Sequence, residues 1–147
     1  MHSTTSSRSL ADRGITSDAL FVASLFSYVA ALFTPAIGGV GGVCGLYALI
    51  LGPLALLASE FSWLANIFLW GAWLARKKPK TLPVALAILA LIVAGTFLLG
   101  HLVIPGRSNQ NYIVGPGYWL WLASMVLAGA SALIYVQPSA KVQSGAA

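Results

Sequence analysis

The feature that most constrains this chain is the scarcity of charge along its length. Between Asp18 and Arg76 the only formally charged residue is Glu60. The whole chain of 147 residues is 59% apolar and 7% charged, whereas soluble domains are on average about 45–50% apolar and about 25% charged. A soluble fold of this size would expose far more apolar surface than one small core can hide. We therefore expect an all-α integral membrane protein.

The distribution of basic residues indicates membrane topology and not nucleic-acid binding. The net charge is +5, but the cations lie at the ends of apolar runs instead of following one face or groove. Cys44 is the only cysteine, which excludes a disulfide and a thiolate-only metal site within one chain. We expect the lipid bilayer as the main partner, with no nucleic acid, metal or cofactor.

Four apolar runs are long enough to cross the membrane as helices, since about 20 residues span about 30 Å of hydrocarbon. They comprise residues 19–36, 59–75, 83–104 and 118–136. Pro83 fits the first turn of the third helix, where its missing N–H costs nothing. Residues 105–116 hold two prolines and two glycines around a polar centre, which is typical of a short loop. These runs predict a single transmembrane bundle over residues 19–137.

The glycine-rich segment 40–57 is the ambiguous part of this topology. Together with the run that follows it, the segment is too long for one crossing and a little short for two with a turn. Gly52-Pro53 would kink or end a helix there. We predict a kinked re-entrant or interfacial helix between the first and second crossings. If the segment spans instead, the chain has five crossings and its basic cluster faces outward.

Charge bias sets the orientation of the bundle, because short loops rich in lysine and arginine stay in the cytoplasm. The densest basic cluster consists of Arg76, Lys77, Lys78 and Lys80. The polar segment 1–18, expected to be a mobile tail, carries Arg8 and Arg13, so an even number of crossings should separate it from the cluster. Residues 138–147 then form a second cytoplasmic tail. The pattern favours a bacterial inner (cytoplasmic) membrane with both termini in the cytoplasm.

Small residues recur at helical spacing in three of the predicted crossings. Helices in lipid pack through small side chains, which let their backbones approach closely. The stripes consist of Ala23, Ser27 and Ala31; of Ala87, Ala90 and Ala94; and of Ser124, Ala128 and Ala132. Each stripe has two interpretations, packing inside the bundle or an interface with a second copy or another membrane protein.

One face of the second predicted crossing combines an amide with indole rings. Trp63, Asn66, Trp70 and Trp73 recur at steps of three or four residues and therefore share a helix face. An amide without a partner in hydrocarbon costs several kcal/mol, so Asn66 should face protein or water. This face is either a satisfied bundle interior or the lining of a binding or coupling site.

Glu60 also has two interpretations. If Ser59 is the N-cap of the second crossing, Glu60 lies in the first turn, where a carboxylate complements the helix dipole at the membrane boundary. If Glu60 lies deeper, against segment 40–57, its carboxyl could carry a proton or bind a cation. Small multidrug-type transporters also have about four helices and one membrane glutamate, but their glutamate lies in the first helix.

The remaining chemistry-bearing residues do not form a catalytic set. His101 is the only histidine in a predicted crossing, so one chain cannot hold a haem between two histidines, although a dimer could. The glycines at positions 38, 41, 42 and 45 lack the lysine and hydroxyl of a phosphate loop and indicate a turn or a close-packing site. Neither a nucleophile with its base nor a pair of carboxylates is present, and we expect no enzymatic activity.

Two aromatic motifs, WLAN at 63–66 and GYWLWLAS at 117–124, resemble short uncharacterised bacterial inner-membrane proteins with four helices. The resemblance implies no activity. Our leading hypothesis is an accessory, assembly or protective subunit that works by helix–helix association, as a homo-oligomer or with another membrane protein. The alternative is a small proton- or cation-coupled transporter or channel that uses Glu60.

Overall fold

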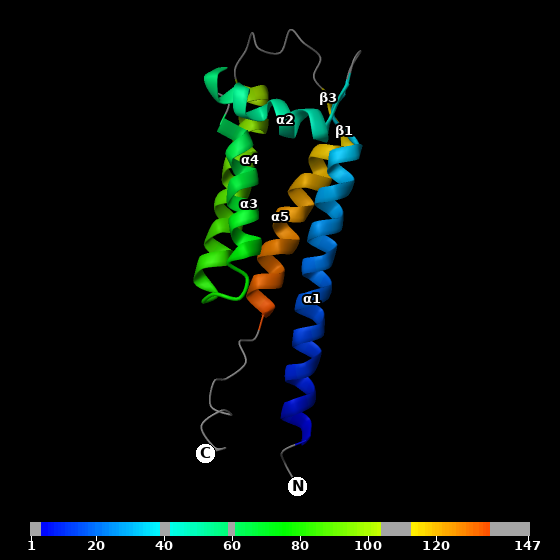
Figure 1. The fold of residues 1–147 in the computed structure, drawn as a ribbon, viewed down its shortest axis with the longest axis vertical. Helices are drawn as coiled ribbons and strands as arrows, with labels where there is room; N and C mark the ends of the chain where they lie inside the picture. The colour runs from blue at the N-terminus through cyan, green and yellow to red at the C-terminus, as the bar shows by residue number, and fades with distance from the viewer. Residues whose placement is uncertain (1–3, 39–41, 59–60, 104–112, 136–147) are drawn as a thin grey trace.

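The computed structural model describes residues 4–38, 42–58, 61–103 and 113–135, and this part of the chain is mainly helical (Figure 1). The five α-helices are α1 (Thr4–Phe33), α2 (Gly45–Ala55), α3 (Leu64–Leu74), α4 (Thr81–Val103) and α5 (Pro116–Ile134). Short 3₁₀ turns, η1 (Leu56–Ala58) and η2 (Phe61–Trp63), follow α2 and precede α3. The strands are β1 (Pro35–Gly38), β2 (Val43–Cys44) and β3 (Ile113–Val114).

Three of the helices are long and apolar enough to cross a membrane. They are the stretches Asp12–Phe33 of α1, Thr81–Leu99 of α4 and the whole of α5. The apolar helix Phe61–Leu74, formed by η2 and α3, is shorter, and so is Gly45–Leu54 in α2. The structure thus confirms a helical bundle with apolar helices of membrane-crossing length.

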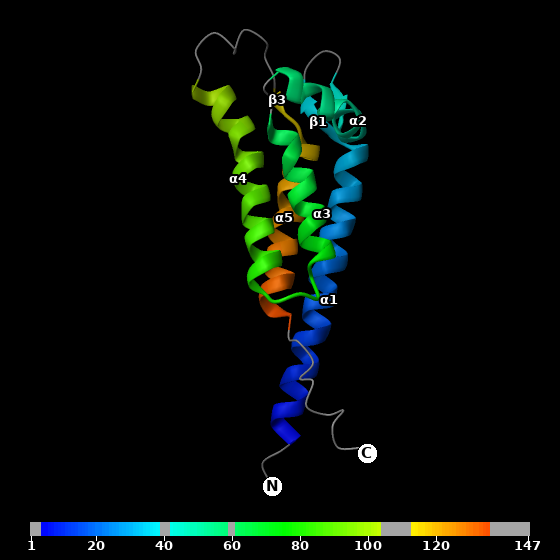
Figure 2. The ribbon, with the colours of Figure 1, turned by 60° about the vertical axis from the view of Figure 1, so that its left-hand side comes forward.

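The helices α1, α3, α4 and α5 run alongside one another, and α2 lies across one end of them (Figures 1 and 2). We call this end, which also carries the strands, the α2 end. The turn that joins α3 to α4 contains Lys77 and Lys78 and lies at the opposite end, here called the basic end. Along the bundle, α1 packs mainly against α5, and α3 packs mainly against α4.

Helix α1 extends well beyond the apolar run that begins at Ala19. Its first residue is Thr4, so most of the segment predicted as a polar tail is helical. Ser17 is fully buried against α5, and Asp18 is paired with Arg76. These contacts fix the polar part of α1 against the rest of the bundle. A hydropathy pattern does not detect them, because they are made by polar side chains.

A small three-stranded antiparallel sheet, in the order β2-β1-β3, lies at the α2 end and was not predicted. Glycines allow the helices beside it to approach: a Cβ on Gly45 would lie 2.2 Å from the Ala31 carbonyl oxygen, and one on Gly115 would lie 2.2 Å from that of Pro35. Gly45 N also donates a hydrogen bond of 3.1 Å to the Thr34 carbonyl. The sheet therefore ties the starts of α2 and α5 to the end of α1.

The core of the bundle is built from small side chains and a few large ones. Its buried members are Tyr28, Ala65, Leu69, Ala90, Ala94, Met125 and Ala128. Alanines at the helix contacts let the backbones approach closely, as membrane helices require. Larger apolar side chains on the outer surface, such as Phe26 and Ile92, are exposed and form a lipid-compatible exterior.

Candidate functional site

Three groups of hydrogen-bonded side chains, which we call the polar tiers, join α1, α5 and the α3 region inside the bundle. The first tier lies at the basic end. Ser17 Oγ donates to the Ser131 carbonyl at 3.0 Å, and Ser131 Oγ donates to the Ser17 carbonyl at 2.9 Å. Arg76 Nη2 donates to Ser17 Oγ at 3.2 Å and also pairs with Asp18. This tier is a reciprocal serine contact that is covered by a guanidinium group.

Arg76 is the most sheltered charge of the first tier. Its side chain is 15% exposed, whereas that of Asp18 is 70% exposed. The guanidinium carbon lies 4.4 Å from the ring centre of Phe21 and 5.5 Å from that of Tyr135. Because arginine can extend its charged group to the membrane boundary while its stem remains in an apolar environment, this position suits the edge of a bilayer.

The second tier lies seven residues further along α1 and seven residues earlier in α5. Ser24 Oγ donates to the Ser124 carbonyl at 2.7 Å, and Trp73 Nε1 donates to Ser24 Oγ at 3.0 Å. Both serines are fully buried. As in the first tier, a serine of α1 donates to the backbone of α5 and accepts from the α3 side.

The third tier is centred on Asn66 of α3. Tyr28 Oη of α1 and Trp121 Nε1 of α5 both donate to Asn66 Oδ1, at 3.2 and 2.9 Å. Asn66 Nδ2 donates to the Trp63 carbonyl at 3.2 Å. Because an indole N–H can only donate, Trp121 fixes which end of the Asn66 amide faces it. A single buried amide thus connects three helices.

Helix α2 is attached to the bundle by a contact that its own proline makes possible. Pro53 has no N–H, so the carbonyl of Leu49, four residues earlier, loses its helical partner. Trp63 Nε1 donates to this carbonyl at 3.0 Å. The indole fits there because position 52 is a glycine, whose Cβ would lie 1.8 Å from Trp63 Cδ1. The Gly52-Pro53 pair and Trp63 therefore act together to attach α2 to the bundle.

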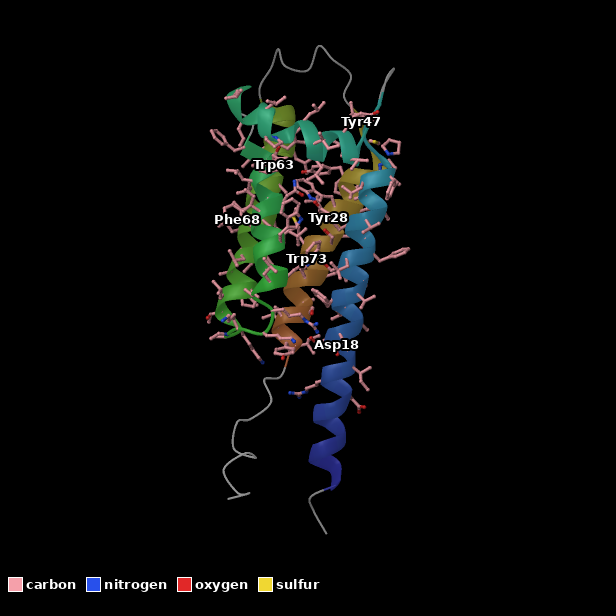
Figure 3. All side chains as sticks on the ribbon, viewed as in Figure 1. Asp18, Tyr28, Tyr47, Trp63, Phe68 and Trp73 are labelled. Atoms are coloured by element: carbon pink, nitrogen blue, oxygen red, sulfur yellow. The ribbon has the colours of Figure 1, made fainter. Side chains whose placement is uncertain are left out.

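A cavity of about 300 Å³ lies between α2 and the third tier. Tyr28, Asn66 and Trp121 contribute to its lining from the bundle, and Leu49, Gly52 and other residues of α2 contribute from above. In Figure 3, Tyr28 lies in the interior between α1 and α3, and Trp63 lies just beneath α2. The described residues that line the cavity are mostly apolar or aromatic, and none of them carries a formal charge.

The predicted aromatic face of the second crossing points into this interior. Asn66 is 6% exposed, and Trp63 lines the cavity. Trp70 and Trp73 pack against the core and meet the ring of Tyr28 edge-on, at centroid distances of 6.5 and 5.2 Å. The structure therefore brings all four predicted residues to the inner side of one helix, each in a protein environment.

The predicted small-residue stripes lie at different depths. The stripe of α4 (Ala87, Ala90 and Ala94) and that of α5 (Ser124, Ala128 and Ala132) are buried within the chain. On α1, Ala31 is buried, but Ala23 and Ser27 are only half-buried. These residues pack mainly within the bundle, which leaves the larger apolar side chains for contacts with the surroundings.

The sequence predicted Ser124 only as a packing residue, and it assigned no role to Tyr28, Trp121 or the other buried serines, Ser17, Ser24 and Ser131. The serines have a sequence signal: Ser17, Ser24 and Ala31 are spaced by seven residues, and so are Gly117, Ser124 and Ser131. A repeat of seven is typical of a seam between two helices packed at a small angle, and it is not visible at the spacings of three and four that define the small-residue stripes. Tyr28 and Trp121 have no comparable signal, because their shared partner Asn66 comes from a third helix.

Two predicted candidates gain no description from the structure. Glu60 lies outside the described residues, so its place relative to α2 stays a prediction. His101 belongs to the last turn of α4, and its side chain also lies outside what is described. Within the described ranges, no three histidine, cysteine or acidic side chains are grouped in a way that could hold a metal ion.

Comparison with known proteins yields no relative. No protein-family model matches the chain, and no curated protein or solved structure shows significant similarity to it.

Proposed function

We propose that this protein is a multi-pass membrane protein with four crossings, which uses α1, the η2–α3 segment, α4 and α5. The three long apolar helices support a membrane location. The segment of η2 and α3 runs beside α4 for much of its length, which supports a fourth crossing although its described part is shorter (Figure 2). A bilayer can be thinned locally or a short helix can be extended by flanking residues at modest cost.

The distribution of charge supports a cytoplasmic basic end. Lys77, Lys78 and Lys80 lie there, together with the start of α1 and the end of α5. By the positive-inside rule, this end faces the cytoplasm of a bacterial inner membrane, with both termini on that side. Helix α2, which lies across the opposite end, is then an interfacial helix on the outer side.

Within this topology we assign the protein an accessory or assembly role through contacts in the plane of the membrane. The observation that carries the proposal is that the hydrogen bonds of the polar tiers are made between helices of the chain itself and not with the surroundings. What the bundle offers to its surroundings is a lateral apolar surface on α1, α4 and α5, where large side chains such as Phe26, Ile92 and Val126 are exposed. Such a surface suits lipid and a neighbouring membrane protein or a second copy.

The topology is tested by cysteine accessibility in intact cells. In a Cys44→Ser background, single cysteines at Lys78 and Asn109 are labelled with a membrane-impermeant thiol reagent. We expect labelling at position 109 and none at 78 until the cells are opened. Labelling at 78 alone in intact cells would reverse the orientation, and labelling at both would disprove the single crossing by α4 that the topology places between the two positions.

The association is tested by photo-cross-linking from the lateral surface. A photoreactive amino acid replaces Phe26, Ile92 or Val126 in turn, and Ala90, which is fully buried, serves as the matched control position. We expect at least one surface position to give a defined cross-linked species in native membranes, with the control giving none. A product of twice the chain mass identifies a homo-oligomer, and a different mass identifies a partner protein. Lipid adducts alone at all three positions would refute the accessory role.

A further inference from the structure

The cavity beneath α2 combines an apolar wall with hydrogen-bond donors that have no acceptor among the described residues. Asn66 is 94% buried and lines the cavity. Its Oδ1 already accepts from Tyr28 and Trp121, and one of its two N–H groups donates to the Trp63 carbonyl. An amide nitrogen carries two hydrogens, so the second N–H of Asn66 is free to donate.

A second donor lies on the same side of the helix. Ser62 is in η2, four residues before Asn66, which places both side chains on one helix face. Ser62 also lines the cavity, and its hydroxyl makes no hydrogen bond within the part of the chain that the structure describes. The two residues therefore offer a pair of neighbouring donors to whatever occupies the cavity.

The absence of charge among the described lining residues determines what such an occupant can be. A charged group in this cavity would lose its hydration without gaining an ionic partner from the described lining residues. Two donors instead select a molecule with acceptor oxygens, and the aromatic and aliphatic walls select an apolar body. A volume of about 300 Å³ accommodates a ring or a short chain segment and not a whole lipid.

We propose that this cavity is a binding site for a neutral, largely apolar molecule whose carbonyl oxygen accepts hydrogen bonds from Asn66 and Ser62. Two sources share this chemistry, the ester carbonyl of a membrane glycerolipid and the ring carbonyl of a quinone. The cavity lies at the α2 end, where the proposed topology places the outer membrane interface, and this position suits either source. This site is separate from the lateral surface on which the accessory role depends, so one can fail without the other.

The experiment uses the indoles that line the cavity as reporters. Trp63 and Trp121 contribute to its wall, and both quinones and brominated acyl chains quench indole emission. The purified full-length protein in detergent micelles is titrated with a benzoquinone that carries a short alkyl tail. In a separate titration it receives a phosphatidylcholine with a brominated acyl chain.

Substitutions at Ser62 separate binding from folding. Ser62→Ala removes one donor and no hydrogen bond described within the chain, so it should weaken binding about 2- to 10-fold, as expected for one hydrogen bond. Ser62→Phe fills the cavity and should abolish saturable quenching. Thr96→Ala is the matched control, since its hydroxyl lies on α4 outside the cavity lining and donates to the Val93 carbonyl. This variant should bind like the parent.

The outcomes are distinct. If only one probe gives saturable quenching, and Ser62→Phe abolishes it, the chemical class of that probe is the occupant. If both probes give saturable quenching and compete with each other, the carbonyl group that they share is the feature that the site recognises. Quenching that rises linearly with either probe, or that survives unchanged in a folded Ser62→Phe variant, overturns the proposal. Folding of each variant is checked by its thermal unfolding in the absence of probe.

Discussion

Removal of the Asn66 amide is the most direct test of the third tier. The substitution Asn66→Ala deletes the acceptor that Tyr28 and Trp121 share and the donor to the Trp63 carbonyl. It leaves a phenol O–H and an indole N–H in the bundle interior with no acceptor from α3. The rings themselves stay in place, since Tyr28 also meets Trp73 edge-on at 5.2 Å.

The magnitude follows from the two bonds that cross between helices. Hydrogen bonds between membrane helices average about 0.6 kcal/mol and reach about 1.7 kcal/mol, so two of them contribute about 1.2 to 3.4 kcal/mol. The side chain is also buried, so its loss removes packing as well as polarity. We expect Asn66→Ala to lower the free energy of unfolding by about 1–3 kcal/mol, which is about 5- to 150-fold in the folding constant.

The assay is reversible unfolding in mixed micelles of a mild detergent and dodecyl sulfate, followed by tryptophan fluorescence. Ile67→Ala is the control, because Ile67 is the next residue of the same helix and is 47% exposed to the surroundings. In a lipid-like environment a truncation on the outer face should change stability by less than about 0.5 kcal/mol, since lipid is as apolar as the side chain removed. Equal effects of the two substitutions would refute the reasoning, and so would an Asn66→Ala protein as stable as the parent.

Two further predictions use the same assay. Gly52→Ala places a methyl group 1.8 Å from the Trp63 indole, so the ring must move and lose its hydrogen bond to α2. We expect this substitution to destabilise the protein by about 1–2 kcal/mol and to change the indole emission. Gly95→Ala is the control, because open space surrounds Gly95, and it should be neutral or slightly stabilising. Arg76→Ala should cost more than about 1 kcal/mol because the sheltered guanidinium contacts serine and two rings, while Asp18→Asn, at the exposed end of the ion pair, should cost less than about 0.5 kcal/mol. A larger effect at Asp18 than at Arg76 would contradict the arrangement of the first tier.

The apolar helices of membrane-crossing length and the shared face of the η2–α3 segment follow from the sequence, because both depend on local patterns. Runs of uncharged residues set helix length, and a period near 3.6 sets which side chains share a face. The period therefore places Trp63, Asn66, Trp70 and Trp73 on one face, and in the structure this face lies on the inner side of the bundle. That Asn66 needs a polar partner also follows, from the cost of an unpaired amide in hydrocarbon.

The identity of the partners does not follow from the sequence. Tyr28 is 38 residues from Asn66, and Trp121 is 55 residues from it. The serine contacts join positions 100 and 114 residues apart. Which helices become neighbours depends on the packing of the whole bundle, and local periodicity carries no information about it. The three-stranded sheet was missed for the same reason, since its strands pair across the sequence and are only two to four residues long.

The polar tiers also bear on the transporter alternative. A solute that moved from the cavity at the α2 end along the interface of α1 and α5 would meet all three tiers before it reached the basic end. In the first two tiers, serine hydroxyls of α1 bond directly to backbone carbonyls of α5, at 3.0 and 2.7 Å, so these helices touch with no room between them at either level. Passage between these helices would break both serine contacts and the hydrogen bonds to Asn66 Oδ1 in the third tier. The freed groups would then meet hydrocarbon and not water. The described contacts therefore close the interface of α1 and α5 toward the basic end, and a transporter that used this route would have to separate the two helices.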